Sequence, residues 1–124
     1  MTGPRLPGLR AELIERAARQ HAARQGVEAA EPTADDTERI NAVHEENVRW
    51  FATVVATAGW PGRRLVGADG THAAFALARC APTPYRAAWL PKARSAAHHG
   101  DVSQRAVQLL AAQVEADRRT AWVR

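Results

Sequence analysis

The sequence has little cysteine, the residue that cross-links small secreted domains through disulfides, and few of the residues that favour β-sheets. It has one cysteine, Cys80, so no disulfide can form within the chain. Aromatic residues make up only 6%, and β-branched residues are few. No apolar run approaches the roughly 18 residues that a membrane span needs, and residues 1–19 lack the apolar core of a signal peptide. These absences argue against a sheet protein and a membrane protein, and predict a cytoplasmic location.

Lysine is also nearly absent, and the charge is unevenly distributed. Residues 1–62 carry seven arginines against nine acids, a net charge of −2; residues 63–124 carry ten Lys or Arg against four acids, a net charge of +6. Such asymmetry is typical of a surface for an anionic partner, although an arginine-rich genome would give the same pattern. Because no aromatic residues are interleaved with the basic ones and no nucleic-acid motif is present, the sequence argues against nucleic acid as the partner.

Alanine dominates the apolar residues, and it is the best helix former. Apolar positions at helical spacing, with Gly, Pro and cap residues between them, predict five helices. Their approximate ranges are 9–24, 35–58, 71–81, 85–98 and 103 onward. We therefore expect an all-α single domain over residues 1–124, packed as antiparallel helical hairpins, with a flexible segment at 1–8 and a linker at 26–34.

The second predicted helix is the clearest, with Asp35 or Asp36 as its cap. Asn47 lies near the centre of its apolar face and His44 near one edge. An unsatisfied buried amide costs about 1–3 kcal/mol, so Asn47 needs partners. Asn47 either makes a structural hydrogen bond to a neighbouring backbone group or lines, with His44, a pocket inside the bundle.

The stretch GWPGRRLVGADGTHAAF, residues 59–75, contains half of the glycines. Gly62 and Gly67 have the spacing that opens a phosphate-binding loop, but Ala68 and Asp69 replace the Lys-Ser/Thr pair and no strand precedes them. The pattern favours a corner between two helices, with Trp60 packed on the core. An anion could still bind at the N-terminus of the following helix, near Arg63, Arg64 and His72.

The remaining reactive residues give weaker signals. The five histidines show no HExxH motif and no zinc spacing with cysteine, so we expect no metal and no cofactor. His98 and His99 end a predicted helix, which is typical of a surface position. Cys80 follows Arg79 and is either a small buried apolar residue or a thiol activated by that arginine.

The chain resembles an uncharacterised bacterial family, common in actinobacteria, over about residues 10–118. The matches include Gly59-Trp60-Pro61, Leu65-Val66-Gly67, Gly70, Ala73-Ala74, Leu90-Pro91 and, with one conservative change, Gly100-Asp101-Val102-Ser103. Among polar positions the family pattern is met at Arg24, Asn47, Asp117 and Arg118, and more loosely at His72. The resemblance implies the helical scaffold but no established activity.

The departures from that pattern are mostly polar. Gln20-His21 stand where the family has Asp-Gln, His44 stands for an aspartate, and Arg64 stands for a serine. Residues 79–82 (Arg-Cys-Ala-Pro) replace Gln-His-Ala-Asp, and the Gln-x-Tyr-Gly-Thr tail has no counterpart. This is the pattern expected where a scaffold is kept and its site is rebuilt or lost.

Two functions are consistent with these observations. The first is a binding or adaptor protein whose basic second half meets an acidic protein or a small anionic ligand. The second is a small cofactor-free enzyme of a specialised-metabolite pathway that uses general acid–base chemistry. Its candidate catalytic residues are His44, Asn47 and His72. The candidate substrate-binding or anion-binding residues are Arg24, Trp60, Arg64, Asp117 and Arg118.

Overall fold

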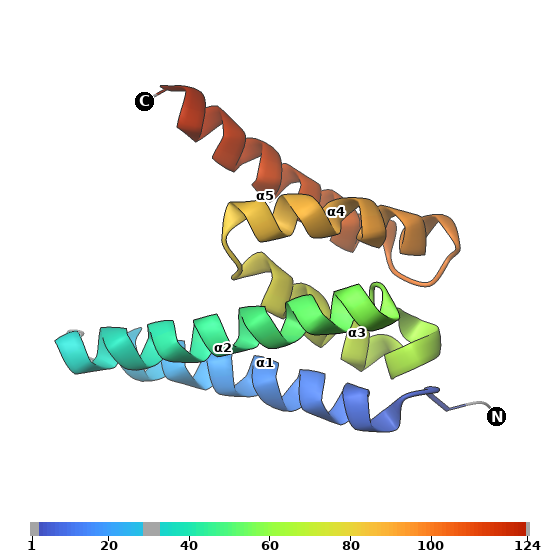
Figure 1. Ribbon diagram of the computed structural model, residues 1–124, viewed down its shortest axis with the longest axis horizontal. Helices are drawn as coiled ribbons and strands as arrows, with labels where there is room; N and C mark the ends of the chain where they lie inside the picture. Colours follow the sequence, from blue (N-terminus) through green and yellow to red (C-terminus); the bar gives the residue numbers. More distant parts are fainter. Residues whose placement is uncertain (1–2, 29–32, 124) are drawn as a thin grey trace.

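The computed structural model describes residues 3–28 and 33–123, and all five elements in them are helices. They are α1 (Pro7–Glu28), α2 (Ala34–Ala58), α3 (Arg63–Arg79), α4 (Thr83–His98) and α5 (Gln104–Val123). The predicted all-α class is therefore confirmed (Figure 1). Within the described ranges, none of these helices has the length and apolar character needed to cross a bilayer.

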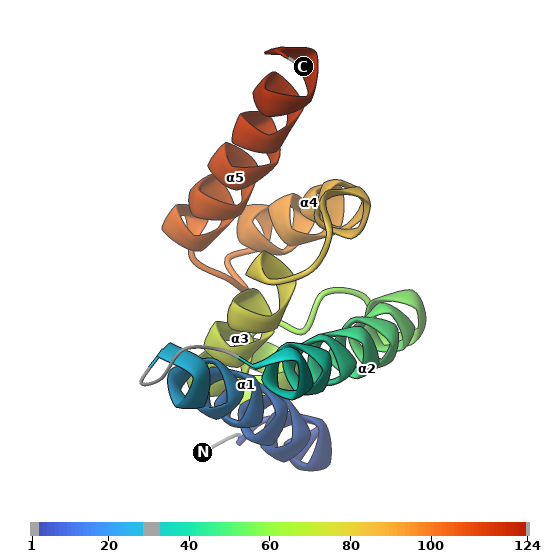
Figure 2. The same ribbon diagram turned by 90° about the vertical axis from the view of Figure 1, so that its left-hand side faces the viewer.

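The helices form two hairpins joined by α3. Helices α1 and α2 run antiparallel at one side of the molecule, and α4 and α5 form a second hairpin at the other (Figures 1 and 2). Helix α3 packs most extensively on α1 and carries the chain from the first hairpin to the second. The two ends of α3 therefore lie in different surroundings.

The first helix is longer than the sequence predicted. It begins at Pro7 and continues to Glu28, so most of the predicted linker is either helical or outside the described residues. The backbone N–H groups of Arg5 and Leu6 donate to the carbonyls of Arg64 and Leu65, over 3.0 and 2.8 Å. These hydrogen bonds tie the part of the predicted flexible segment from Arg5 onward to α3.

The cap of α2 also differs from the prediction. Thr33, rather than Asp35 or Asp36, is the cap residue. Its hydroxyl accepts the N–H of Asp36, and the Asp36 carboxylate accepts the N–H of Thr33, each over 3.2 Å. In this reciprocal arrangement the acid serves as the third residue of the helix, which satisfies two N–H groups that would otherwise lack partners.

The glycine-rich stretch is mostly helix rather than loop. Helix α3 starts at Arg63, eight residues earlier than predicted, and is interrupted only at Gly67, whose φ of 75° requires glycine. Asp101 explains the early start: its carboxylate accepts the N–H of Arg64 (2.9 Å) and its carbonyl accepts the N–H of Arg63 (2.8 Å). A residue 37 positions away thus caps this helix.

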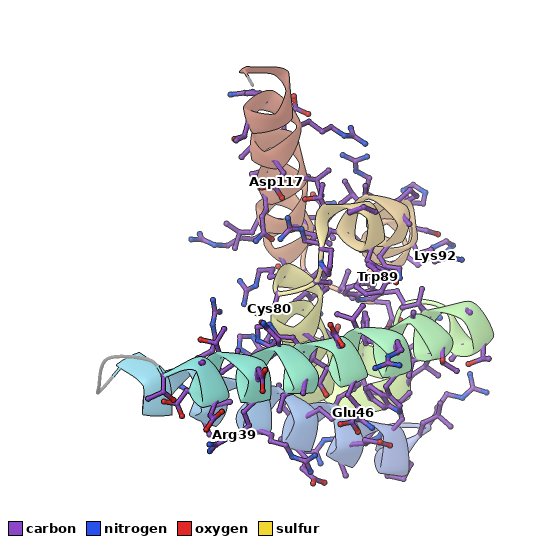
Figure 3. The ribbon with its side chains drawn as sticks, turned by 60° about the vertical axis from the view of Figure 1, so that its left-hand side comes forward. Arg39, Glu46, Cys80, Trp89, Lys92 and Asp117 are labelled. Atoms are coloured by element: carbon purple, nitrogen blue, oxygen red, sulfur yellow. The ribbon has the colours of Figure 1, made fainter. Side chains whose placement is uncertain are left out.

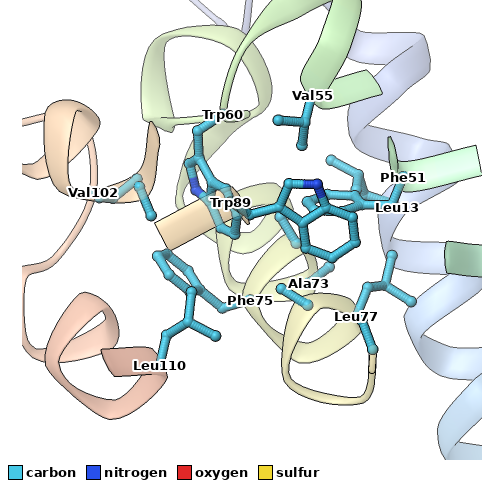
Figure 4. Close-up of a cluster of buried hydrophobic side chains, with 14 of the residues drawn as sticks. Leu13, Phe51, Val55, Trp60, Ala73, Phe75, Leu77, Trp89, Val102 and Leu110 are labelled. Atoms are coloured by element: carbon cyan, nitrogen blue, oxygen red, sulfur yellow. The ribbon is translucent and has the colours of Figure 1, made fainter. Parts of the chain in front are cut away.

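The core lies where α2, α3 and α4 meet (Figure 4). Phe51 packs edge-on against Trp60 and Trp89, with ring centroids 5.5 and 5.0 Å apart, and Trp60 also meets Phe75 at 4.6 Å. All four rings are at most 5% exposed. Helix α4 continues through Pro91 as one helix.

Candidate functional site

A basic pocket lies at the C-terminal end of α3. It has a volume of about 610 Å³, within the roughly 300–1,000 Å³ typical of small-molecule sites. Its polar lining consists of Gln20, His21, Arg24, His44, Arg79, Cys80, Arg86 and Gln113, which together come from all five helices and the turn after α3. Among the described residues, its lining contains no Asp or Glu. The pocket therefore favours a negatively charged occupant.

A second, more apolar pocket adjoins the first between α2 and α4. Its volume is about 400 Å³, and Val48, Pro82 and Tyr85 contribute to its wall. His44 and Cys80 line both pockets. Figure 3 shows Cys80 at the end of α3, between α2 and the α4–α5 hairpin. The thiol thus stands at the junction of a basic and an apolar cavity.

Arg24 and Arg79 supply the uncompensated charge of the basic pocket. The Nη1 of Arg24 donates to the Sγ of Cys80 over 3.6 Å, so α1 reaches the end of α3 at this point. Neither arginine forms an ion pair with a described side chain. Both side chains belong to exposed residues and retain donors for a ligand.

Arg86 is held differently, because it is only 8% exposed. It forms an ion pair with Asp117, and its Nη1 donates to the carbonyl of Arg79 over 3.0 Å. Thr83 joins this cluster by donating to Asp117 over 2.9 Å. Burial lowers the pKa of Arg86 from its ordinary value. These bonds fix α4 against α5 at the wall of the pocket.

Unsatisfied polar atoms concentrate around the basic pocket. The described residues contain five buried side-chain N or O atoms without a hydrogen-bond partner. Three of them belong to residues of this lining: His44 Nε2, Arg86 Nε and Gln113 Oε1. Each such group costs about 1–3 kcal/mol when it has no partner. Their concentration in one place marks the pocket as the least satisfied polar region of the fold.

His44 is a neutral proton acceptor in this setting. Burial, and to a smaller extent the positive charge of Arg24, lowers the pKa of His44 below its usual value of 6.5. Both effects disfavour the imidazolium form. At neutral pH the ring therefore adds hydrogen-bonding capacity to the pocket rather than a third free positive charge.

The other predicted catalytic residues do not join His44. Asn47 is 4% exposed, but its amide donates to Gln20 Oε1 (3.1 Å) and accepts from Arg16 Nη1 (3.0 Å). It therefore bridges α1 and α2, through side chains rather than through the neighbouring backbone that the sequence suggested as a structural partner. His72 is exposed on α3 and lies outside the lining of both pockets.

The predicted anion-binding residues separate into groups. Arg24 lines the basic pocket, whereas Trp60 and Arg64 line a cavity of about 370 Å³ at the opposite end of α3. Asp117 is engaged by Arg86 and Thr83, and Arg118 is exposed outside the basic pocket. The sequence-based set therefore does not form a single site.

Arg86 and Gln113 were not among the residues predicted from the sequence. Spacing offered a signal for both: Arg86 shares a helical face with Leu90 and Ala93, and Gln113 shares one with Leu110 and Val114. A charged or amide residue on a buried helical face needs a partner, which makes it a candidate for a polar site. No group of three His, Cys, Asp or Glu residues able to hold a metal ion occurs in the described part of the chain.

Comparisons with protein-family models, with curated proteins and with solved structures give no match for this chain. The resemblance to the bacterial family thus stays a prediction.

Proposed function

We propose that the protein is a binding module that holds a small anionic ligand, such as a carboxylate or phosphate compound, in the basic pocket. The observation that carries this proposal is the lining itself, in which Arg24 and Arg79 have no described acidic partner. Guanidinium groups bind carboxylates and phosphates through paired, charge-assisted hydrogen bonds. A ligand anion would supply the missing acceptors.

The unsatisfied atoms support the same proposal. Two of them, His44 Nε2 and Arg86 Nε, belong to groups that line the pocket from α2 and α4. A bound polar molecule in this cavity offers them partners that the protein does not provide. Several of the positions at which the chain departs from the resembled family pattern, Gln20-His21, His44 and Arg79-Cys80, also line this pocket, whereas Arg64 lies at the other end of α3. Under that resemblance, Gln20 and His44 replace two aspartates and Arg79 replaces a glutamine, so the pocket has lost negative charge and gained positive charge.

Isothermal titration calorimetry with citrate at low ionic strength tests the proposal. We expect saturable 1:1 binding that weakens with added salt. The double variant Arg24→Gln/Arg79→Gln should bind at least about tenfold more weakly, because a hydrogen bond to a charged group is worth about 1.5–3 kcal/mol.

The matched control is Arg63→Gln/Arg64→Gln, which removes the same charge from the other end of α3. It should bind citrate as the wild type does. If this control loses binding while the first double variant keeps it, the anion site lies at the wrong end of the helix and the proposal fails.

A second candidate function is acid–base catalysis with His44 as the base. The buried, unpartnered Nε2 of a neutral imidazole favours it. Here Asn47 serves as a structural bridge and His72 takes no part, so the chemistry depends on His44 beside Cys80 and Arg24. His44→Gln separates the two functions: a pure binding role predicts that citrate affinity changes by less than about threefold, since Arg24 and Arg79 remain.

A further inference from the structure

The basic pocket contains a reactive atom, the sulfur of Cys80, in addition to its positively charged arginines. Its side chain is partly exposed and lines both cavities at the end of α3. Arg24 reaches its Sγ from a position 56 residues away in the sequence, and Arg79 precedes it directly. Arg86, which is 92% buried and has an unpartnered Nε, lines the same cavity. The thiol therefore lies within a cluster of guanidinium groups.

We propose that Cys80 exchanges with low-molecular-weight disulfides that carry carboxylates, and that the basic pocket selects them by charge. The proposal rests on the anion-binding role of the pocket and names the chemical class of its ligand. A disulfide whose two halves carry carboxylates can place one carboxylate on Arg24 or Arg79 while its sulfur reaches Cys80. The less polar stem can then enter the apolar pocket beside Tyr85.

The exchange is balanced without an added oxidant. The Cys80 thiol loses its proton to solvent, and the thiolate attacks one sulfur of the disulfide RS–SR. A bond forms between Cys80 and that sulfur as the RS–SR bond breaks, and RS⁻ leaves with the electron pair. The products are a mixed disulfide on Cys80 and one equivalent of free thiolate.

The chain itself makes a clean measurement possible, because Cys80 is its single cysteine. Intact-protein mass spectrometry gives the rate of modification by glutathione disulfide, which is anionic, by cystamine, which is cationic, and by 2-hydroxyethyl disulfide, which is neutral. We expect the folded protein to react about tenfold faster with glutathione disulfide than with cystamine at low salt. The preference should largely vanish in about 1 M salt, where the screening length is about 3 Å.

Two references separate the tertiary pocket from the local sequence. In urea the unfolded chain keeps Arg79 beside Cys80 but loses Arg24, so the anionic preference should fall by about threefold or more. Arg24→Gln should give the same fall in the folded protein, and Arg24→Lys should retain the preference because the charge remains. Arg63→Gln, at the start of α3, should behave as the wild type does.

Equal charge preference in the folded and unfolded chains, or faster reaction with cystamine, would overturn the exchange proposal. So would failure of the folded protein to react with any of the three reagents that modify it in urea. If citrate still binds in any of these cases, the anion-binding function stands and only the exchange fails. If citrate binding and charge preference are both absent, the exchange proposal and the proposed function both fail.

Discussion

The two ends of α3 carry similar charges but differ in how their backbone and buried polar groups find partners. At the N-terminal end, Arg63 and Arg64 give their backbone N–H groups to Asp101, a residue of the protein itself. At the C-terminal end, Arg24 and Arg79 have no described acidic partner, and three lining residues of the basic pocket have unsatisfied buried atoms. The start of α3 is thus capped within the protein, whereas its C-terminal end gathers more of the buried polar atoms that lack partners.

This difference assigns separate roles to the two ends. The glycine-rich stretch at the N-terminal end resembles a phosphate loop in its glycine spacing, yet it packs Trp60 against Phe51 and Phe75 and caps its helix internally. The C-terminal end has no motif, but its side chains converge from helices that are distant in sequence. A motif with regular glycines can therefore serve the fold while the candidate site forms elsewhere.

The largest expected effect is on stability at the N-terminal end. Trp60→Ala should lower the free energy of unfolding by about 3–5 kcal/mol, because it removes a buried ring that contacts two others. Trp60→Phe should cost less than about 1.5 kcal/mol, since it keeps a ring and removes the unpartnered indole N–H. Urea denaturation measures both.

Citrate affinity of folded Trp60→Phe should equal that of the wild type, because the ring lies at the other end of α3 from the basic pocket. If Trp60→Phe is as unstable as Trp60→Ala, the indole N–H has a role that its lack of a partner does not suggest. If Trp60→Phe loses citrate binding, the two ends are not separable.

A smaller effect is expected at the cap. Asp101→Ala removes the acceptor of the Arg64 N–H and should destabilise the protein by about 1 kcal/mol, a typical value for a lost helix cap. Asp101→Asn is the matched control, since its amide oxygen still accepts the hydrogen bond and only about 0.5 kcal/mol of charge–dipole energy is lost. Thermal unfolding distinguishes the two. A larger loss in Asp101→Asn than in Asp101→Ala would show that the carboxylate does not act as a cap.

The smallest effect concerns the pH dependence set by His44 at the C-terminal end. Burial gives this residue a lower pKa in the folded chain than the 6.5 of an ordinary histidine, so the unfolded chain binds the proton more tightly. The contribution of His44 to stability is therefore constant above about pH 6.5 and decreases as pH falls below that value. As the pH falls below about 6.5, the free energy of unfolding of His44→Gln should therefore decrease less than that of the wild type.

The matched control for the loss of one histidine is His72→Gln, which changes an exposed position outside the basic pocket. Denaturation between about pH 5 and pH 7.5 measures the slopes of the three proteins. A slope in His44→Gln as steep as that of the wild type would contradict the assignment of a buried, neutral His44.

Much of the fold could be predicted from the sequence because its signals are local. Alanine-rich segments with apolar residues at helical spacing predicted five helices, and all five are present. Two of the differences arise where a distant residue takes part: Asp101 starts α3 at Arg63, and the carbonyls of Arg64 and Leu65 hold the segment before α1. No local pattern contains those hydrogen bonds.

The candidate site was less predictable, for a related reason. The sequence placed Asn47 on the apolar face of α2, and this residue is buried, but its partners Gln20 and Arg16 lie about 30 positions away on α1. Arg24 was a candidate through the family pattern, but the charge split between the two halves of the chain gave no sign that this residue of the acidic half shares a pocket with Arg79.

The sequence by itself determined the helical class, the approximate helix positions and the net positive charge, because propensity, periodicity and composition act over short distances. Only the tertiary structure decided which charges meet. It paired Arg86 with Asp117, gave Asp101 to the start of α3, and left Arg24 and Arg79 beside Cys80. Electrostatic energies depend on distance and burial, and both are set by how the helices pack.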